Sequence, residues 1–370
     1  MNFKTAYSTR TNIQEAVQDL KSQLLGFDTN LVLFFASPAY DPATISAEMY
    51  RTFQEVNTIG CTTSGEIVSG QMLDQSVVAM AFHTSVTSDL KAEVVTDIRT
   101  DEHAVNKAFV SFEQHFGTSM DTMHPSEYVG IVLIDGVSGC EEVINEKIGD
   151  VTNVTFVGGS PGDDLQFKAT YVYANGKAYE EAALLLLMKP TIPFSILKTQ
   201  SFQESGQVLT VTETNEAARE VISFNGQPAS TAYAQALGVA EETLSDHVFK
   251  NPLGLVLAKN EPFVRSPRVI EDERVLFYCN VKKGMSLSVL NSTDIVEDTQ
   301  LALESKKKEM KQVSGIINFN CILRTLDLKE QNRTQEYANL FANIPTVGFS
   351  TYGESYIGHI NQTATMLLFG

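Results

Sequence analysis

The sequence predicts an α+β protein made of two packed domains, with mixed or antiparallel sheets covered by helices. Its 370 residues exceed the length at which a single hydrophobic core usually stops growing, and 43% of them are hydrophobic. A unit of strand, helix, strand, glycine turn and strand occurs three times, and the segment between the second and third copies is rich in strand signals. Two prolines interrupt an apolar strand at 189–193, so we predict an N-terminal domain at 1–190 and a C-terminal domain at 191–370.

The first copy of the unit begins with the apolar strand 31–35. A helical stretch at 45–53 follows, then a glycine turn within 59–66 and a strand at 76–82. Before this copy, the apolar residues of 13–25 have the spacing of one amphipathic helix, which we expect to pack on its own domain.

The second and third copies repeat this order. The second copy has its elements at 129–134, 141–148 and 157–163, followed by strands on either side of an Asn175-Gly176 hairpin turn. The third has them at 315–319, 331–342, 347–354 and 364–369. Between these two copies the sequence predicts a helix that begins after Asp294 and strands at 194–199, 208–212, 253–257, 275–281 and 286–290.

The three glycine turns share one motif: an apolar residue, Gly, any residue, Ser or Thr, one or two residues, Gly, and an acid. Glycine lets a ligand approach the backbone, hydroxyls donate and accept hydrogen bonds, and an acid can anchor an amine or a backbone N–H. A tight turn capped by its own Ser or Thr is the simpler explanation of any single copy, but three copies favour convergence on one cleft at or near the domain boundary. The candidate ligand-binding residues in these motifs are Cys61, Thr62, Ser64, Glu66, Gly159, Ser160, Asp163, Asp164, Tyr352 and Glu354.

Charge and composition exclude several classes of partner. A net charge of −18 repels phosphate backbones and anionic lipid headgroups, so we expect neither a nucleic acid nor a membrane as partner. The sequence shows no signal peptide and no apolar run of bilayer length. The four cysteines are far apart in sequence and form no metal-binding pattern, which fits reduced thiols and a cytoplasmic location. A homodimer is left open.

These motifs resemble the FIST family, a prokaryotic sensory module with tandem N- and C-terminal domains, over nearly the whole chain. The N-terminal matches are Gly60–Glu66, Ser76–Ala79, Gly158–Ser160, Gly162–Asp164 and Thr170–Val172. The C-terminal matches are Asn225–Ala229, Phe319–Cys321, Arg324, Gly348–Glu354 and Asn361–Thr363. The family pattern has His directly before Asn-Gln-Thr, whereas here Ile360 intervenes; in a strand this places His359 on the opposite face.

The resemblance implies a ligand-binding input domain for signal transduction and not an enzyme. It adds Arg324, Asn361 and Gln362 to the candidate ligand-binding residues. Without a fused output module in this sequence, the chain looks like the stand-alone haem-binding nitric-oxide sensors that regulate a separate histidine kinase. The resemblance therefore implies haem as the ligand and a histidine kinase or another signalling protein as the partner.

Haem requires an apolar cavity, an axial donor and a group that neutralises its propionates. By context, His83 and His359 are the candidate axial ligands, although an ordinary histidine at a strand edge is the commoner explanation. Arg324, and after it Arg265 and Arg268, could hold propionates or other carboxylates, where a plain salt bridge is the commoner role.

Two other functions stay open. A small polar metabolite such as an amino acid could place its carboxylate on Arg324 and its ammonium on Glu66, Asp163 or Glu354. A cysteine-dependent hydrolase would use Cys61, Thr62 or Ser64 as its nucleophile. No histidine lies near Cys61 in sequence, and Gly or Phe takes the equivalent position in the other two copies, so catalysis is the weakest of these readings.

Overall fold

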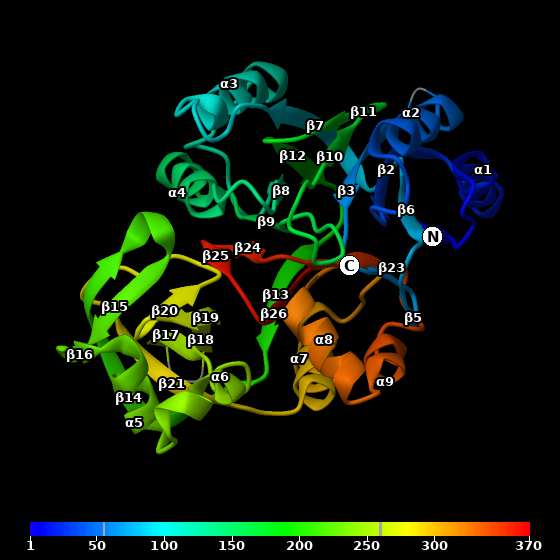
Figure 1. The fold of residues 1–370 in the computed structure, drawn as a ribbon. Coiled ribbons are helices and arrows are strands. Elements are labelled where there is room, and N and C mark those ends of the chain that lie inside the picture. Colours follow the sequence, from blue (N-terminus) through cyan, green and yellow to red (C-terminus); the bar gives the residue numbers. More distant parts are fainter. Residues whose placement is uncertain (55, 259–260) are drawn as a thin grey trace. The chain divides into compact units, whose positions relative to one another are not determined.

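The computed structural model describes residues 1–54, 56–258 and 261–370 (Figure 1). The chain forms two compact units, each of which draws on segments distant in sequence. Unit 1 comprises Met1–Lys198, Gln300–His359 and Ala364–Gly370, and unit 2 comprises Thr199–Thr299 and Ile360–Thr363. The predicted α+β class with mixed sheets is confirmed.

Unit 1 consists of three copies of one succession of elements, and each copy is longer than the sequence unit. Repeat 1 contains β1 (Phe3–Ser8), α1 (Ile13–Leu24), β2 (Thr29–Ala36), α2 (Pro42–Thr52), β3 (Asn57–Thr62), β4 (Glu66–Val68), β5 (Gln71–Leu73) and β6 (Val77–His83). Repeat 2 contains β7 (Thr87–Val95), α3 (Ala104–Phe116), β8 (Val129–Ile134), α4 (Glu141–Val151), β9 (Phe156–Gly159), β10 (Val172–Ala174), β11 (Lys177–Tyr179) and β12 (Ala183–Pro190). Repeat 3 contains β13 (Phe194–Gln200), α7 (Ile295–Met310), β22 (Gly315–Cys321), α8 (Ile322–Glu330), α9 (Thr334–Asn339), β23 (Thr346–Thr351), β24 (Glu354–Tyr356), β25 (His359–Ile360) and β26 (Thr363–Phe369).

Each repeat builds the same four-stranded core of a sheet. The strand orders are β1-β6-β2-β3, β7-β12-β8-β9 and β13-β26-β22-β23. In each order, the last two strands, such as β2 and β3, are joined by a helical crossover and are parallel. The strand that comes last in the sequence of the repeat, such as β6, pairs antiparallel with the first strand of that parallel pair. A parallel pair needs such a crossover, which is why each repeat carries a helix at this point.

The repeats exchange their short strands in a cycle, which completes three six-stranded sheets. The β4-β5 hairpin of repeat 1 extends the sheet of repeat 3, β24 and β25 of repeat 3 extend the sheet of repeat 2, and the β10-β11 hairpin of repeat 2 extends the sheet of repeat 1. Each repeat thus completes the sheet of another repeat, so none of the three sheets can form from one repeat alone.

The inner faces of the three sheets share one hydrophobic core. Phe35 of repeat 1 lies 4.6 Å from Phe349 of repeat 3, measured between ring centroids, and Phe3 lies 5.0 Å from Phe369. Repeat 2 adds buried residues of β8 and β12 such as Leu186 to the same core. Strands buried on both faces carry near-continuous apolar runs, which explains why β2, β8 and β12 stand out in the sequence.

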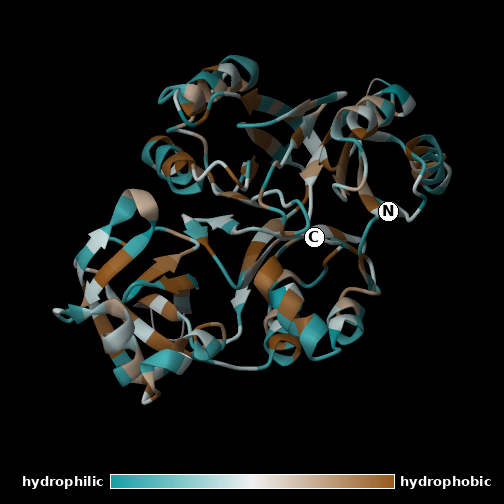
Figure 2. Ribbon diagram, in the orientation of Figure 1, coloured by the Kyte–Doolittle hydropathy of each residue, from teal (hydrophilic) through white to brown (hydrophobic). Residues whose placement is uncertain are grey.

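Helices cover the outer faces of these sheets. Helices α1 and α2 bury Val17, Leu20 and Ile45 against the first sheet, and α3 and α4 bury Phe112 and Ile144 against the second. In Figure 2 the helices show hydrophobic and hydrophilic colours on different sides, as expected for helices with one buried face. Within the described ranges, no helix is both long and apolar enough to cross a bilayer.

Unit 2 is inserted in the chain between β13 and the last turns of α7. It contains β14 (Phe202–Asn215), β15 (Glu220–Phe224), β16 (Gln227–Pro228), α5 (Ala229–Leu237), α6 (Leu244–His247), β17 (Leu253–Ala258), β18 (Glu261–Arg265), β19 (Pro267–Glu271), β20 (Arg274–Phe277) and β21 (Ser286–Ser292), with 3-10 turns η1 (Glu216–Ala218) and η2 (Glu241–Thr243). Its sheet has the order β18-β17-β21-β14-β15-β20-β19, and β16 pairs with β15.

Several sequence predictions need correction in detail. The helix expected at 331–342 covers only Thr334–Asn339, and α8 precedes it. Strands β1 and β7 were not predicted, because charged and polar residues interrupt their apolar pattern. The predicted domain boundary between residues 190 and 191 stays a prediction; it coincides with the end of repeat 2, and the compact units divide the chain at other positions. The predicted helix after Asp294 is α7, and the Asp294 carboxylate accepts hydrogen bonds from two backbone N–H groups of its first turn.

Candidate functional site

The three glycine motifs meet inside unit 1, where their backbones are hydrogen-bonded in a cycle. Ser350 N–H donates to Gly65 O at 2.8 Å, and Ser160 N–H donates to Gly353 O at 2.8 Å. The third contact closes the cycle through Gly162 N–H, which donates to Thr62 O at 3.3 Å. The strand exchange described above produces this arrangement, because each motif joins a strand of its own sheet to the hairpin that enters the next sheet.

The first glycine of each motif is required by packing between strands. A Cβ atom on Gly60 would lie 1.6 Å from Phe34 O, and the corresponding distances are 1.7 Å at Gly158 and 2.0 Å at Gly348, in both cases to a carbonyl of the neighbouring parallel strand. No side chain fits at such distances. These glycines therefore let two strands approach each other, and their place in the motif has a structural cause that does not involve a ligand.

The acids of the first and third motifs cap their own turns. The Glu66 carboxylate accepts hydrogen bonds from the Thr63 hydroxyl and from Ser76, whose N–H lies at 3.1 Å and whose hydroxyl lies at 2.6 Å. The Glu354 carboxylate accepts the equivalent bond from the Thr351 hydroxyl. Both acids are fully buried. In both turns a threonine of the turn thus bonds to the acid of the same turn, which is the simpler explanation that the sequence analysis considered. Anchoring of a ligand amine by either acid stays a prediction.

Burial changes the ionisation of Glu66. Loss of hydration raises the pKa of its carboxyl from 4.5 to about 7, although the hydrogen bonds from Ser76 and Thr63 oppose this shift. Glu66 thus combines a buried position at the motif junction with a pKa near neutrality.

The second motif departs from the pattern of the other two. In two of the sheets, an acid of the exchanged strand pairs with the motif strand: Glu66 in the sheet of repeat 3 and Glu354 in the sheet of repeat 2. In the sheet of repeat 1, the residue that pairs in this way is Val172. The acid of the second motif, Asp163, comes instead from an insertion between β9 and β10. Its carboxylate accepts backbone N–H bonds from residues 167, 168 and 169 at 2.7 to 3.1 Å, and so caps the loop that follows it.

Tyr352 connects the third motif to this loop. Its hydroxyl donates to the Asp163 carboxylate and accepts the N–H groups of Asp163 at 3.2 Å and Leu165 at 2.7 Å. Its ring stacks on Phe167 with 4.7 Å between centroids. The first motif contributes Ser64, whose hydroxyl accepts the N–H of Asp164 at 3.0 Å.

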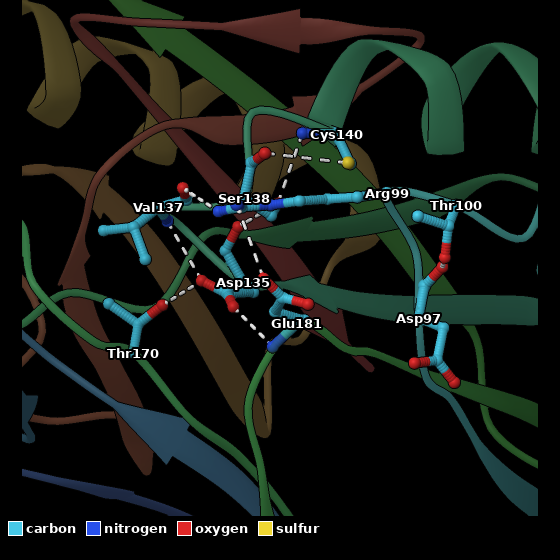
Figure 3. A network of polar contacts seen from close by, with 9 residues as sticks. All are labelled: Asp97, Arg99, Thr100, Asp135, Val137, Ser138, Cys140, Thr170 and Glu181. Carbon is cyan, nitrogen blue, oxygen red and sulfur yellow. Dashed lines mark hydrogen bonds and ion pairs between the residues drawn. The ribbon is translucent and has the colours of Figure 1, made fainter.

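A second buried carboxylate, Asp135, orders the same insertion from the other end (Figure 3). It accepts the Thr170 hydroxyl at 2.5 Å and the N–H of Glu181 at 2.7 Å. Thr170 in turn accepts the N–H of Gly136 at 2.9 Å. The sequence analysis missed Asp135, although an acid at the carboxyl end of a buried parallel strand is a signal that could have identified it.

Arg324 lies in a buried polar cluster on the third sheet. It belongs to the first turn of α8, is only 2% exposed, and donates from Nε to Asn320 Oδ1 at 3.0 Å. Asn320 is itself held by the Tyr337 hydroxyl at 3.1 Å and by Thr325 at 2.9 Å. Thr325 also contacts the Ser350 hydroxyl of the third motif at 2.8 Å, which joins this cluster to the junction.

The proposed nucleophiles are poorly placed for catalysis. Cys61 is fully buried in the core shared by the three sheets, and burial raises the pKa of its thiol well above the usual value. A buried, protonated thiol is a poor nucleophile. The Thr62 hydroxyl accepts the N–H of Tyr171 at 3.0 Å, and Ser64 holds the backbone of Asp164.

The two candidate haem ligands have different surroundings. His83 ends β6, and its Nδ1 accepts the N–H of Ser85 at 3.2 Å. This contact uses Nδ1 and leaves Nε2 as the nitrogen that could bind iron, so the role of His83 as an axial ligand stays a prediction. His359 is buried in β25, next to Gly358, where an added Cβ atom would meet nothing within 4 Å. The neighbouring Ile357 is exposed, so this open space can be solvent, and the burial of the imidazole is the observation that fits a donor.

The remaining candidates belong to unit 2. Gln362 is buried, accepts the Ser266 hydroxyl at 2.7 Å and donates to Phe249 O at 3.0 Å. Asn361 is also buried. Arg265 lies in β18, and Arg268 lies in β19 with an exposed side chain. Unit 1 therefore brings together the motif residues and Arg324, and the roles of all these residues in ligand binding stay predictions.

Comparison with known proteins identifies the family. The model of the FIST N domain matches residues 30–227, and that of the FIST C domain matches residues 229–356. The uncharacterized protein MJ1623 of Methanocaldococcus jannaschii is 20% identical over 284 residues, which cover 71% of this chain and 54% of that protein. The chain thus spans about half the length of this relative. FIST domains are sensory domains of signal transduction that bind small ligands, and this chain, which carries both domains in tandem, belongs to the FIST family.

Proposed function

We propose that this chain senses a small polar ligand that carries a carboxylate, such as an amino acid, at the junction of the three glycine motifs. The observation that carries this proposal is the buried Arg324 guanidinium, which a polar cluster orients and joins to the third motif through Thr325 and Ser350. A planar guanidinium matches a carboxylate in two parallel hydrogen bonds.

The polarity of the junction supports a polar ligand. Its side chains are hydroxyls, carboxyls and a guanidinium, all of which prefer hydrogen-bonding partners to an aromatic macrocycle. Glu66, Asp163 and Glu354 already accept hydrogen bonds from their own turns. We assign recognition of the ligand to Arg324, whose guanidinium matches a carboxylate in shape and charge, and to the hydroxyls of the motifs, and give the acids the task of holding the turns in position.

The test is calorimetric titration with a panel of amino acids and of carboxylic acids without an amino group. Replacing Arg324 by alanine should weaken a carboxylate ligand by about 1.5 to 3 kcal/mol, the usual range for a hydrogen bond to a charged group. Arg324→Lys keeps the charge but loses the planar fork, so it should recover only part of the affinity. Arg274→Ala is the matched control, because Arg274 is an exposed residue of unit 2 paired with Glu220. Equal affinity in folded Arg324→Ala would contradict the proposal.

Haem is the second candidate ligand, favoured by the burial of His359 beside Gly358. A bound haem iron would supply the nitric-oxide binding centre, with His359 as its protein donor. The absorption spectrum after haem reconstitution, with and without nitric oxide, separates the two candidates. A Soret band that shifts in His359→Ala but not in His83→Ala would support haem, whereas a flat spectrum would leave the polar ligand.

The output partner that we propose is a separate histidine kinase. A partner with a basic surface would complement the net charge of −18. Measuring kinase autophosphorylation with and without the ligand-loaded protein would test this assignment, and an unchanged rate would count against it.

A further inference from the structure

The insertion in repeat 2 is the point at which unit 1 departs from its threefold pattern. In repeats 1 and 3 the motif strand reaches the exchanged hairpin through a short glycine turn. In repeat 2 the connection from β9 to β10 takes residues 160–171, none of which is assigned to a helix or strand. We call residues 163–169 the strap.

The backbone of the strap is strained. Asp164, Leu165 and Phe167 have φ angles of 54°, 63° and 51°, in the left-handed region that residues with a Cβ atom rarely adopt. A cluster of such residues persists only when surrounding contacts impose it. The strap also presents apolar side chains to solvent, since Leu165 is 41% exposed and Phe167 is 52% exposed.

The contacts that impose this conformation come from the strap's own Asp163, which caps residues 167–169, and from the other two motifs. The Tyr352 hydroxyl of the third motif holds Asp163 and Leu165, and the Ser64 hydroxyl of the first motif holds Asp164. The Tyr352 ring also stacks on the Phe167 ring. No strand pairing fastens the strap, so these contacts and the cap that the Asp163 carboxylate places on residues 167–169 oppose the backbone strain.

We propose that the strap is a two-state element latched by Tyr352. In the closed state, described above, the Tyr352 hydroxyl holds the strap against its strain. In the open state this bond is broken, the left-handed residues relax, and Phe167 leaves the Tyr352 ring. A change at the first or third motif moves Ser64 or Tyr352, and so shifts the balance between the two states. This inference goes beyond the proposed ligand and does not depend on its identity.

Hydrogen exchange tests the latch without any ligand. Tyr352→Phe keeps the ring stacked on Phe167 but removes the hydroxyl that two backbone N–H groups use. We expect the amides of Leu165 and of residues 167–169 to exchange about tenfold faster or more in this variant, the effect of losing one or two hydrogen bonds. Tyr179→Phe in β11 is the matched control and should leave these amides unchanged.

Fluorescence reports the same equilibrium by a different signal. The chain contains no tryptophan, so Phe167→Trp introduces a single indole, and excitation at wavelengths that tyrosine does not absorb gives emission from the strap alone. Adding Tyr352→Phe should shift this emission to longer wavelength, because the indole leaves its aromatic neighbour for water. In the opposite direction, Leu165→Gly relieves strain in the closed state and should slow amide exchange of the strap relative to the parent.

The outcomes separate a latch from a rigid turn. Slow exchange that is equal in the parent and in folded Tyr352→Phe would overturn the proposal, and so would faster exchange in Leu165→Gly. If Tyr352→Phe does not fold, amide exchange in Leu165→Gly still decides it. A moving strap in a protein that binds no carboxylate would leave this inference standing while refuting the proposed function.

Discussion

Glutamine at position 66 isolates the effect of one buried carboxyl on stability. Glu66 receives hydrogen bonds from Ser76 on one oxygen and from Thr63 on the other. The amide oxygen of glutamine can keep the bonds from Ser76, while its NH₂ group faces Thr63, whose hydroxyl can turn to accept. The substitution therefore preserves the turn and removes only the titration.

The magnitude follows from the pKa of Glu66. The folded protein has a pKa of about 7 at this position, against 4.5 for an exposed glutamate. Because the folded state holds the proton more tightly, protonation stabilises it, and this contribution is lost as pH rises from about 4.5 to 7. The difference between the two values corresponds to about 3 kcal/mol of unfolding free energy.

Denaturant titrations of the parent and of Glu66→Gln at pH 5 and pH 7.5 measure this effect. The negative net charge of −18 should destabilise both proteins as pH rises, so only the difference between them reports Glu66. We expect Glu66→Gln to gain about 2 kcal/mol relative to the parent between the two pH values, less than the full difference because an unfolded glutamate is already mostly ionised at pH 5. Parallel pH dependence of the two proteins would refute the reasoning and assign Glu66 a normal pKa.

Two glycine substitutions test the packing of the motifs and a third tests helix α4, each by its denaturant midpoint. Gly162→Ala places a methyl group 2.2 Å from Ser64 Oγ and should cost about 1 to 3 kcal/mol of stability, so a midpoint equal to the parent's would contradict this packing. Gly348→Ala directs its methyl group at Asn318 O, 2.0 Å away, and should cost about 3 kcal/mol or more. Gly149→Ala, within α4 and in open space, should instead add about 0.5 to 1 kcal/mol, and a loss there would show that α4 is not helical at this point.

The elements that the sequence predicted correctly are those whose signal is local. The apolar runs of β2, β8 and β22 reflect burial on both faces, and the Asn175-Gly176 step marks a hairpin turn by its backbone preference alone. The amphipathic spacing of 13–25 likewise identified α1, which covers Ile13–Leu24. Convergence of the three motifs followed from their repetition, and their backbone contacts show that they meet within unit 1, whereas the predicted cleft at the domain boundary stays a prediction.

Other features depend on contacts between residues far apart in sequence. The predicted repeat began one strand and one helix too late, because the apolar pattern of β1 and β7 is interrupted and reveals itself only through pairing with β6 and β12. The first glycine of each motif suggested room for a ligand, but the atom that excludes a side chain there is a carbonyl of the adjacent strand. Neither register nor approach distance can be read from one segment alone.

The cyclic exchange of strands limits where unit 1 can change shape. Moving the first turn would separate β4 from β23, and moving the third would separate β24 from β9, so either motion breaks a strand pairing between repeats. Moving the strap breaks none, because its residues lie between β9 and β10 and pair with neither. A conformational response at the motif junction therefore costs least in the strap, since its opening needs only the loss of side-chain hydrogen bonds and is partly offset by the release of backbone strain.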